Sequence, residues 1–562
     1  MTIVPERLKA LHTQTPERAA VYLQFAGRED IPITYDQLLR GANAVAQTLA
    51  RQNVQPGDVV VLILQHGEDL LYFFWGAILH GAIPSIMPFL TEKLSPERYR
   101  ADLSALIGVT KPAAIVTYPE FKADVRSAIR AGDSVRSVIL TDQRKEQAEF
   151  DLDSLAGFTT SEDDIVLLQH SSGTTGLQKG VALSHRAVFN QLDAYAKTLA
   201  LNENDVIVSW LPLYHDMGLI AGFLMPILTG IPLVLSSPFD WVRAPYRLLQ
   251  SVSKYRGTLT WLPNFAFNFC SQKIRDRHLE GVNLASWRAV INCSEPVRWE
   301  AHKGFYDSFQ KYRLQREALQ TSYAMAENVF AVTQSQLGNE PAVIEVDRES
   351  FMVQRVASDP FDGRPSMKLM SSGRALENVQ LRVLDENGND VPDRVIGEIA
   401  LKSNCMLTGY FNRPDLTEKA FRGGWYLTGD YGFLDNGELY VSGRKKDMII
   451  VGGKNVYPQD LEALTYEVSG VHAGRSVAFG LFDEAQGTEE VVIIAEVDSE
   501  DPAEQQKVAD ALRMHVTKNS AIALRHVKVV GPKWIVKTSS GKTARAANRE
   551  KFLKELQDNG EA

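Results

Sequence analysis

The sequence is poor in cysteine and has no surplus of positive charge. Three cysteines in 562 residues, without a Cys-x-x-Cys spacing, argue against a zinc site or a disulfide framework and favour a reducing compartment. The formal net charge of −9 argues against a dedicated nucleic-acid-binding protein, whose affinity needs a basic surplus. Residues 1–20 lack an apolar segment after a basic start, so we expect no secretory signal and a cytoplasmic location.

Long hydrophobic runs are also scarce, and only residues 219–235 need to be considered as a membrane span. This stretch is interrupted by Pro226 and Pro232 and by Gly222 and Gly230. A membrane-spanning helix needs about 20 predominantly apolar residues. We therefore predict a buried helix, a turn and a core strand here, and no membrane span.

Alternation of helical and strand patterns dominates residues 1–240. Helical spacing over 34–50 and 68–81 alternates with short apolar runs at 59–64 and 112–118. Such alternation predicts βαβ units, in which mainly parallel sheets are covered by helices. The length alone gives a prior of about three to four domain-sized units. We predict an α/β fold with a large N-terminal lobe.

The pattern changes twice toward the C-terminus. Residues 378–442 contain short strands joined by Asn-Gly and similar turns, which predicts a small β unit. The last part of the chain alternates again and predicts a small α+β domain. We place the domains at 1–445 and 446–562, the second being a mobile lid.

A glycine-rich loop, His170–Gly180, is the sharpest local signal. Its glycines allow positive φ angles and close approach of the backbone to a ligand. Backbone N–H groups, several hydroxyls and Lys179 are suited to binding a polyphosphate. The loop lacks the Gly-Lys-Ser/Thr ending of a Walker A motif. Taken alone, a loop of this composition is more often an ordinary surface hairpin.

Other motifs favour a phosphate-binding loop over a surface hairpin. Together with this loop they resemble the acyl-adenylate-forming (AMP-binding) superfamily and, within it, the fatty acyl-AMP ligases. Gln178, Ala324 and Val536 depart from the usual pattern without removing a charged group. The motifs follow in the family's order and span nearly the whole chain: WLPLYHDMG (210–218), NCSEP (292–296), SYAMAE (322–327), WYLTGD (425–430), GRKKD (443–447), NVYPQDLE (455–462) and KTSSGKTAR (537–545).

The resemblance implies an enzyme that uses ATP and Mg²⁺ to activate a medium- or long-chain fatty acid as acyl-AMP, with release of pyrophosphate. It further implies transfer of the acyl group to the phosphopantetheine thiol of a separate acyl carrier protein, as in polyketide or lipopeptide biosynthesis. Both reactants of the first step are anions, so the site must neutralise charge and align atoms. A carboxylate can accept hydrogen bonds from both hydroxyls of a ribose, and a mobile lysine can stabilise charge at the α-phosphate.

By the same resemblance, each role falls on positions that match a motif. Lys542, His215 and Glu327 are the expected catalytic residues, Glu327 and Thr174 the expected magnesium ligands, and Lys446 the expected hinge. The expected ATP- and AMP-binding residues are Ser171, Ser172, Gly173, Thr174, Thr175, Gly176, Lys179, Ser294, Glu295, Pro296, Ser322, Tyr323, Asp430 and Arg444.

Two questions stay open at this level. Apolar residues 217–224 and 263–270 are expected to line the acyl pocket, but they do not specify the length of the acid. A segment at about Pro341–Lys368 resembles the extra segment that is thought to hinder CoA thioester formation in fatty acyl-AMP ligases. An acyl-CoA ligase remains the alternative function, and a nucleotide-binding protein with a decayed site is a third reading.

Overall fold

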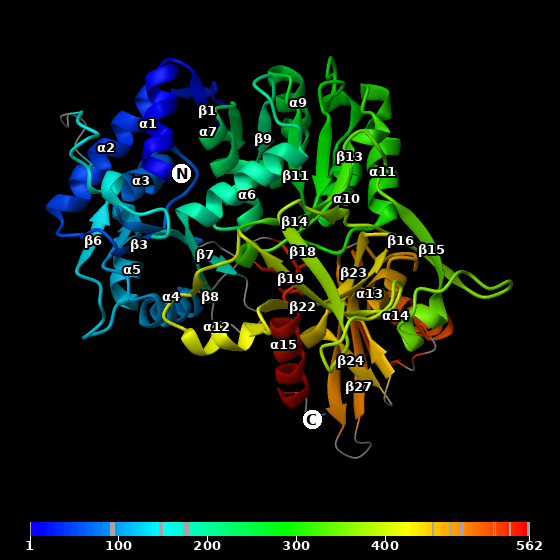
Figure 1. Ribbon diagram of the computed structural model, residues 1–562. Coiled ribbons are helices and arrows are strands. Elements are labelled where there is room, and N and C mark those ends of the chain that lie inside the picture. Colours follow the sequence, from blue (N-terminus) through cyan, green and yellow to red (C-terminus); the bar gives the residue numbers. More distant parts are fainter. Residues whose placement is uncertain are drawn as a thin grey trace.

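The protein was analysed as a computed structural model (Figure 1). It describes residues 2–89, 96–144, 150–171, 179–451, 454–472, 474–483, 488–520, 522, 524–538 and 541–558. The side chain of Ser171 and the expected nucleotide-binding and magnesium-binding residues Ser172, Gly173, Thr174, Thr175 and Gly176 lie outside this description.

The largest sheet forms the upper part of the large lobe in Figure 1. Its inner strands are parallel, and the strands at its edges pair in antiparallel fashion. In spatial order the strands are β17 (Arg374–Ala375), β14 (Ala331–Gln334), β13 (Leu319–Ala324), β12 (Ala289–Asn292), β11 (Leu259–Leu262), β9 (Ile207–Ser209), β10 (Leu233–Ser236), β1 (Ala19–Gln24) and β2 (Ile31–Thr34).

A second sheet carries the predicted βαβ units of the N-terminal region. Its strands are short and β-branched, and β3, β4 and β5 are buried along their whole length, as expected of strands covered on both faces. The order is β20 (Gly409–Tyr410), β8 (Lys179–Ser184), β7 (Ile165–Ser171), β4 (Ile83–Ile86), β3 (Val59–Leu62), β5 (Ala114–Thr117) and β6 (Ser137–Leu140).

Helices cover these sheets, and two of them show how the sequence sets their ends and their packing. Thr34 and Gln37 form a reciprocal capping box at the start of α2. Gly76 lets α3 approach α2, since a Cβ atom there would lie 2.5 Å from the Cβ of Val45. The large-lobe helices are α1 (Val4–Gln14), α2 (Tyr35–Arg51), α3 (Glu68–Leu79), α4 (Pro96–Thr110), α5 (Lys122–Ala128), α6 (His185–Thr198), α7 (Met225–Thr229), α8 (Pro238–Arg243), α9 (Tyr246–Tyr255), α10 (Asn264–Lys273), α11 (Trp299–Phe309) and α12 (Pro414–Ala420).

The predicted β unit near 378–442 is present as an antiparallel sheet. It contains β18 (Val379–Leu384), β19 (Gly397–Ser403), β22 (Trp425–Asp435), β21 (Phe421–Arg422) and β23 (Glu438–Arg444). The segment expected near 341–368 forms an antiparallel hairpin of β15 (Val343–Asp347) and β16 (Ser366–Met370), with a π-helical turn at Ser350–Gln354 between them.

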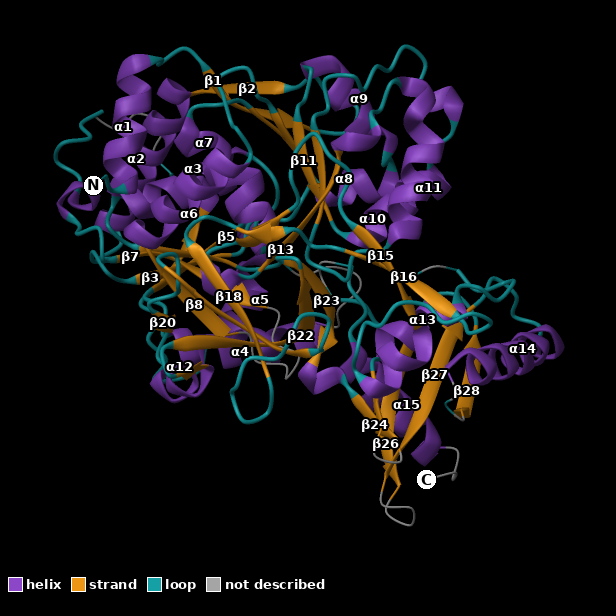
Figure 2. Ribbon diagram, turned by 45° about the vertical axis from the view of Figure 1, so that its right-hand side comes forward, coloured by secondary structure: helices purple, strands orange, loops and turns teal. Residues whose placement is uncertain are grey.

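A small α+β domain follows, at the lower right of Figure 1. Its main sheet has the order β26–β27–β28, and its helices α13 and α14 pack on that sheet. Figure 2 shows this domain projecting from the large lobe. Its elements are β24 (Ile449–Val451), β25 (Lys454–Val456), α13 (Pro458–Thr465), β26 (Ser476–Asp483), β27 (Thr488–Glu496), α14 (Pro502–Ser520), β28 (Leu524–Val530) and α15 (Arg545–Asp558). The α/β fold with a small C-terminal domain is confirmed, and the boundary at residue 446 stays a prediction.

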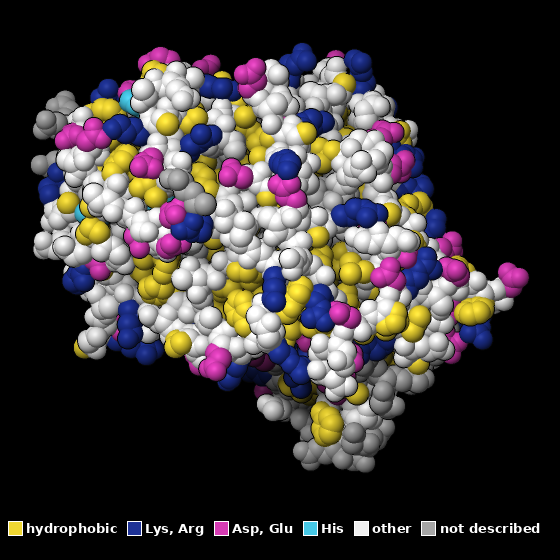
Figure 3. Space-filling model, in the orientation of Figure 1, with side chains coloured by type: hydrophobic (Ala, Val, Ile, Leu, Met, Phe, Trp, Pro, Cys, Tyr) yellow, Lys and Arg dark blue, Asp and Glu magenta, His cyan; other side chains and the backbone are white. Residues whose placement is uncertain are grey.

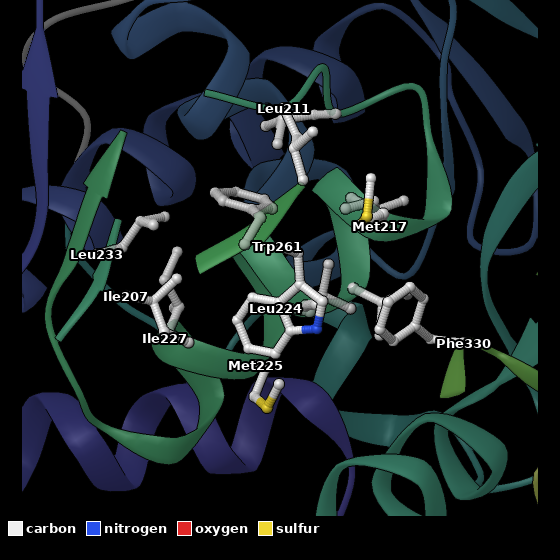
Figure 4. Close-up of a cluster of buried hydrophobic side chains, with 14 of the residues drawn as sticks. Ile207, Leu211, Met217, Leu224, Met225, Ile227, Leu233, Trp261 and Phe330 are labelled. Atoms are coloured by element: carbon white, nitrogen blue, oxygen red, sulfur yellow. The ribbon is translucent and has the colours of Figure 1, made fainter. Parts of the chain in front are cut away.

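The apolar stretch 219–235 lies in the core of the large lobe. It contributes to a buried π-helix at Met217–Leu224, then forms α7 and the buried strand β10. Figure 4 shows the side chains of Met217 and Leu224 packed around Trp261. Among the described residues, we find no helix with the length and apolar character needed to cross a bilayer. The prediction of a buried helix, a turn and a core strand is confirmed.

Gly373 gives a direct test of how the sheet edge is built. Its φ is +92°, and a Cβ atom there would lie 2.1 Å from the carbonyl carbon of Gln334 and 2.2 Å from the nitrogen of Ser335. We expect Gly373→Ala to destabilise the large lobe by about 3 kcal/mol or more, measured by chemical denaturation. Gly363→Ala is the matched control, because Gly363 has φ +78° with no atom within 4 Å of the added carbon. Equal stability losses in the two variants would contradict the steric explanation.

Candidate active site

A groove between the large lobe and the small domain contains most of the described residues that the sequence singled out. Its volume is about 2750 Å³. Both domains contribute side chains to its lining, so the complete groove forms only when the small domain is in place. The predicted residues that line it are Ser294, Glu295, Pro296, Ser322, Tyr323, Asp430, Arg444, Lys446 and Lys542.

The residues expected to bind ribose are brought together by strand pairing. Asp430 on β22 lies directly opposite Arg444 on β23. The Nε atom of Arg444 is 3.3 Å from Oδ1 of Asp430, and the hydroxyl of Tyr323 donates to Oδ2 over 2.7 Å. Asp430 raises the pKa of Arg444. Each carboxylate oxygen keeps a free lone pair, so the buried carboxylate can still accept hydrogen bonds from a diol.

The wall expected to face adenine begins where β12 ends. Ser294 adopts a left-handed conformation, with φ +70°, which turns the chain sharply after the strand. Oε2 of Glu295 accepts a hydrogen bond of 2.9 Å from the backbone N–H of Phe265. On the neighbouring strand β13, the hydroxyl of Ser322 donates to the carbonyl oxygen of Thr333 over 2.7 Å. The wall is therefore held by hydrogen bonds within the large lobe.

Glu327, the expected magnesium ligand, is held by a residue that sequence reasoning missed. Its Oε1 accepts a hydrogen bond of 2.8 Å from the hydroxyl of Tyr410, which lies 3.0 Å from the hydroxyl of Tyr426. The ammonium of Lys179 stands 4.6 Å from the centre of the Tyr410 ring. Burial raises the pKa of Tyr410, so its proton stays available to donate. Of these two tyrosines, only Tyr426 lies within a motif that the sequence analysis quoted, at 425–430; Tyr410 lies in none.

One carboxylate is a suitable protein contribution to a magnesium site. Mg²⁺ usually takes one or two carboxylates and completes its shell with phosphate oxygens and waters. Within the part of the chain that is described, no three His, Cys, Asp or Glu side chains gather into a metal site of their own. The single oxygen anchored by Tyr410 fits this mode of binding.

Lys542 enters the groove from the small domain and lies near two acidic side chains of the large lobe. Removal from bulk water lowers the pKa of Lys542, while the charges of Asp216 and Glu295 act in the opposite direction. Burial also favours the neutral form of Asp216, yet its hydrogen bond with His215 and the charge of Lys542 keep its pKa below the usual value. An ammonium group thus sits in a partly desolvated, negatively biased position.

His215, an expected catalytic residue, contacts Asp216. Its Nδ1 is 3.3 Å from Oδ1 of Asp216, and His215 is not among the described residues that line the groove. Sequence reasoning missed Asp216, although it lies within the quoted motif at 210–218. Its role becomes visible only when the small domain places Lys542 beside it.

The loop that carries Lys542 is closed on itself. The backbone N–H of Thr538 donates to the carbonyl oxygen of Lys542 over 2.7 Å, and the N–H of Lys542 donates back to Oγ1 of Thr538 over 3.1 Å. Gly541 has φ +86°, a conformation that favours glycine. These contacts hold the base of the loop and direct Lys542 into the groove.

Polar contacts near the expected hinge lie both within the small domain and between the two domains. Within the small domain, Arg545 donates to Oδ2 of Asp447 over 3.1 Å and to Oε1 of Glu462 over 2.6 Å. Arg298 of the large lobe lies 3.5 Å from Oδ1 of Asp460. Lys446 directly precedes Asp447 in the sequence and lines the groove. That it serves as the hinge stays a prediction.

The hairpin at 343–370 adds an apolar contact across the same junction. Phe351 and Met352, from its π-helical turn, are buried in one cluster with Phe433 of the large lobe and with Ile449 and Tyr457 of the small domain. The rings of Phe351 and Phe433 are 6.3 Å apart and nearly perpendicular. The extra segment is therefore part of the core that joins the two domains.

The expected acyl-binding residues divide into two groups. Residues 217–224 are buried in the core and do not line the groove among the described residues. Phe265 and Phe269 of the 263–270 segment do line it, together with Trp210 and Trp241. These two indoles are stacked, with ring centroids 3.6 Å apart and planes 2° apart. The 263–270 segment therefore contributes to the groove as expected, whereas residues 217–224 do not line it.

Comparisons with known proteins agree with this architecture. The AMP-binding enzyme family model matches residues 8–411. The chain is 29% identical to the medium-chain-fatty-acid–[acyl-carrier-protein] ligase JamA of Moorena producens, over 98% of this chain and 95% of that protein. It is 31% identical to the long-chain-fatty-acid–AMP ligase FadD28 of Mycobacterium tuberculosis, over 93% of this chain and 92% of that protein.

Solved structures show the same arrangement over the whole chain. One comes from a study of fatty acyl-adenylate ligases from E. coli and L. pneumophila; its TM-score is 0.90 at 27% identity, and the match covers 100% of this chain and 98% of that one. Another is the L. pneumophila fatty acyl-adenylate ligase in complex with acyl adenylate and pyrophosphate, with a TM-score of 0.73 at 28% identity over 98% of this chain and 96% of that one. The chain is therefore an enzyme of the AMP-binding family.

Proposed function

We propose that this enzyme is a fatty acyl-AMP ligase, which converts a fatty acid and ATP into acyl-AMP and pyrophosphate and then passes the acyl group to the phosphopantetheine thiol of an acyl carrier protein. One observation carries the first step. Lys542 of the small domain lines the same groove as the wall expected to bind the nucleotide and the aromatic wall formed by Trp210 and Trp241. Relatives named as fatty-acid–AMP and acyl-carrier-protein ligases support the same activity.

The site residues have distinct tasks in this mechanism. Asp430 binds the ribose hydroxyls, and Tyr323 with Ser294–Pro296 holds the adenine. The fatty-acid carboxylate attacks the α-phosphorus and pyrophosphate leaves, while the ammonium of Lys542 neutralises charge on both reactants. His215 orients Asp216, which keeps Lys542 protonated and in place. Magnesium, when bound by Glu327 and the phosphates, would stabilise the charge of the leaving group.

The acceptor is inferred from the junction between the domains. In the mechanism we propose, the small domain rotates about Lys446 after acyl-AMP forms, so that one site serves two half-reactions. The burial of Phe351 and Met352 with Ile449 and Tyr457 opposes this rotation. Docking of a carrier protein can offset that cost through its own contacts, whereas CoA offers a far smaller surface. In the alternative function, that of an acyl-CoA ligase, binding of CoA would have to offset the cost of rotation with this smaller surface.

The first half-reaction is tested with a panel of fatty acids and labelled ATP. We expect wild-type enzyme to catalyse ATP–pyrophosphate exchange with at least one acid. Lys542→Ala should lower the rate of acyl-AMP formation by about 100-fold or more, because a group that stabilises the transition state is lost. ATP binding should persist, since the ribose and adenine contacts remain. Normal acyl-AMP yield from this variant, or no exchange by the wild type with any acid, would contradict the assignment.

The pH dependence of acyl-AMP formation reports the environment of Lys542. Since removal from bulk water lowers its pKa, the group should lose its proton, and the enzyme its activity, at a lower pH than an exposed lysine would. Bound phosphates favour the charged form, so the alkaline limb should lie higher for kcat than for kcat/KM. In Lys542→Arg the limb should vanish, because a guanidinium stays protonated. An unchanged limb in that variant would assign it to another group.

The acceptor is tested by weakening the junction. Replacing Phe351 and Met352 together by serine should raise acyl-CoA formation at least about tenfold, since each 1.4 kcal/mol removed from the buried cluster shifts the equilibrium between lid orientations tenfold. ATP–pyrophosphate exchange should stay within about twofold. Phe361→Ser is the matched control, because Phe361 lies in the same segment with 52% of its surface exposed. Rapid acyl-CoA formation by the wild type would favour the acyl-CoA ligase instead.

A further inference from the structure

Phe265 lies at the meeting point of three parts of the groove that the mechanism treats separately. It stands in the first turn of α10 and is half-buried. Its ring meets the stacked indoles edge-on, with centroids 6.4 Å from Trp210 at 76° and 6.2 Å from Trp241 at 74°. Such perpendicular packing fixes the orientation of the ring relative to the aromatic wall.

The Cζ end of the ring lies against the loop of the small domain at Gly541. A Cβ atom on Gly541 would lie 3.3 Å from Cζ and 3.5 Å from Cε1 of Phe265. Only a residue without a side chain fits this contact without displacing the ring, and the φ of +86° favours glycine as well. Gly541 directly precedes Lys542, so the ring limits how far the lysine can enter the groove.

The backbone of Phe265 is tied to the nucleotide wall. Its N–H donates to Oε2 of Glu295 over 2.9 Å. The same carboxylate acts electrostatically on Lys542 and opposes the lowering of its pKa. A displacement of Phe265 would therefore disturb its contact with Gly541 and also the position of the Glu295 carboxylate, which acts on the ammonium of Lys542.

We propose that Phe265 is a positioning residue for Lys542, which couples the acyl wall to the lysine loop through Gly541. The inference rests on the proposed function, because it assigns a purpose to the placement of Lys542 during acyl-AMP formation. An acyl chain packed on Trp210 and Trp241 restrains the Phe265 ring, and the restrained ring fixes the position of Gly541. The lysine reaches its working position most readily when the acyl wall is filled.

The test separates the two half-reactions in the full-length enzyme. Single-turnover acyl-AMP formation should fall about 10- to 100-fold in Phe265→Ala, because a misplacement of about 1 Å has that effect on a positioned catalytic group. Transfer from preformed acyl-AMP to the carrier thiol should stay within about twofold, since Lys542 takes no part in it. Phe265→Leu, which keeps an apolar seat, should recover much of the loss. An equal fall in both half-reactions would indicate a merely structural role and overturn the inference.

A double-mutant cycle with Gly541→Ala tests the contact itself. Each single variant should slow acyl-AMP formation, and the double variant should lose less than the product of the two effects, because the side chain that the new methyl meets is gone. Independent effects would overturn the coupling. Ser271→Ala is the matched control: Ser271 lies on the same helix, is not among the described residues that line the groove, and its hydroxyl donates to the carbonyl oxygen of Phe267 over 2.9 Å. It should leave the rate of acyl-AMP formation within about twofold.

The outcomes for the wild type and the variant are distinguishable. If the wild type forms no acyl-AMP with any fatty acid, the proposed function fails and the inference fails with it. If the wild type forms acyl-AMP and Phe265→Ala forms it at the same rate, the function stands and the positioning role is overturned. A selective loss of the first half-reaction supports both.

Discussion

The ammonium group of Lys542 is partly removed from water at the boundary between the two domains, and the rest of the site depends on stabilising its charge. Burial of a charge is costly unless opposite charges face it, and Asp216 and Glu295 of the large lobe supply them. Neither domain provides this arrangement alone. The ion pair between Arg298 and Asp460 and the apolar cluster around Phe351 help to hold the small domain where this charge is balanced. Electrostatic and apolar contacts thus both favour the placement of Lys542 on which the catalytic proposal depends.

The large lobe contributes prearranged, internally bonded walls. Asp430 already accepts from Tyr323, and Glu327 from Tyr410, so their carboxylates need little reorganisation to receive a ligand. On the face shown in Figure 3, basic and acidic side chains are interspersed, so this face carries no large patch of one sign. In the proposed mechanism, recognition of the anionic substrates depends on local groups such as Arg444 and Lys542, which line the groove.

Local sequence patterns predict much of the fold. Helical spacing over 34–50 corresponds to α2 at Tyr35–Arg51, and the apolar run at 59–64 contains β3. Such elements follow from periodicity and capping, which are properties of neighbouring residues. The roles of Asp216 and Tyr410 could not be read this way, because each depends on a partner distant in sequence, Lys542 in one case and Glu327 in the other. The same holds for residues 217–224, whose apolar pattern is shared by core and pocket lining and whose π-helical geometry has no simple signal.

The cluster that contains Phe351, Phe433 and Tyr457 also has a thermal consequence. Separating the domains would expose to solvent the apolar surface that is buried between them in this structure, and hydration of apolar surface raises the heat capacity. Apolar burial weakens as water is cooled, because its driving force near room temperature is mainly entropic. The contact between the domains should consequently be less stable at low temperature, and the temperature dependence of acyl transfer should be curved on an Arrhenius plot.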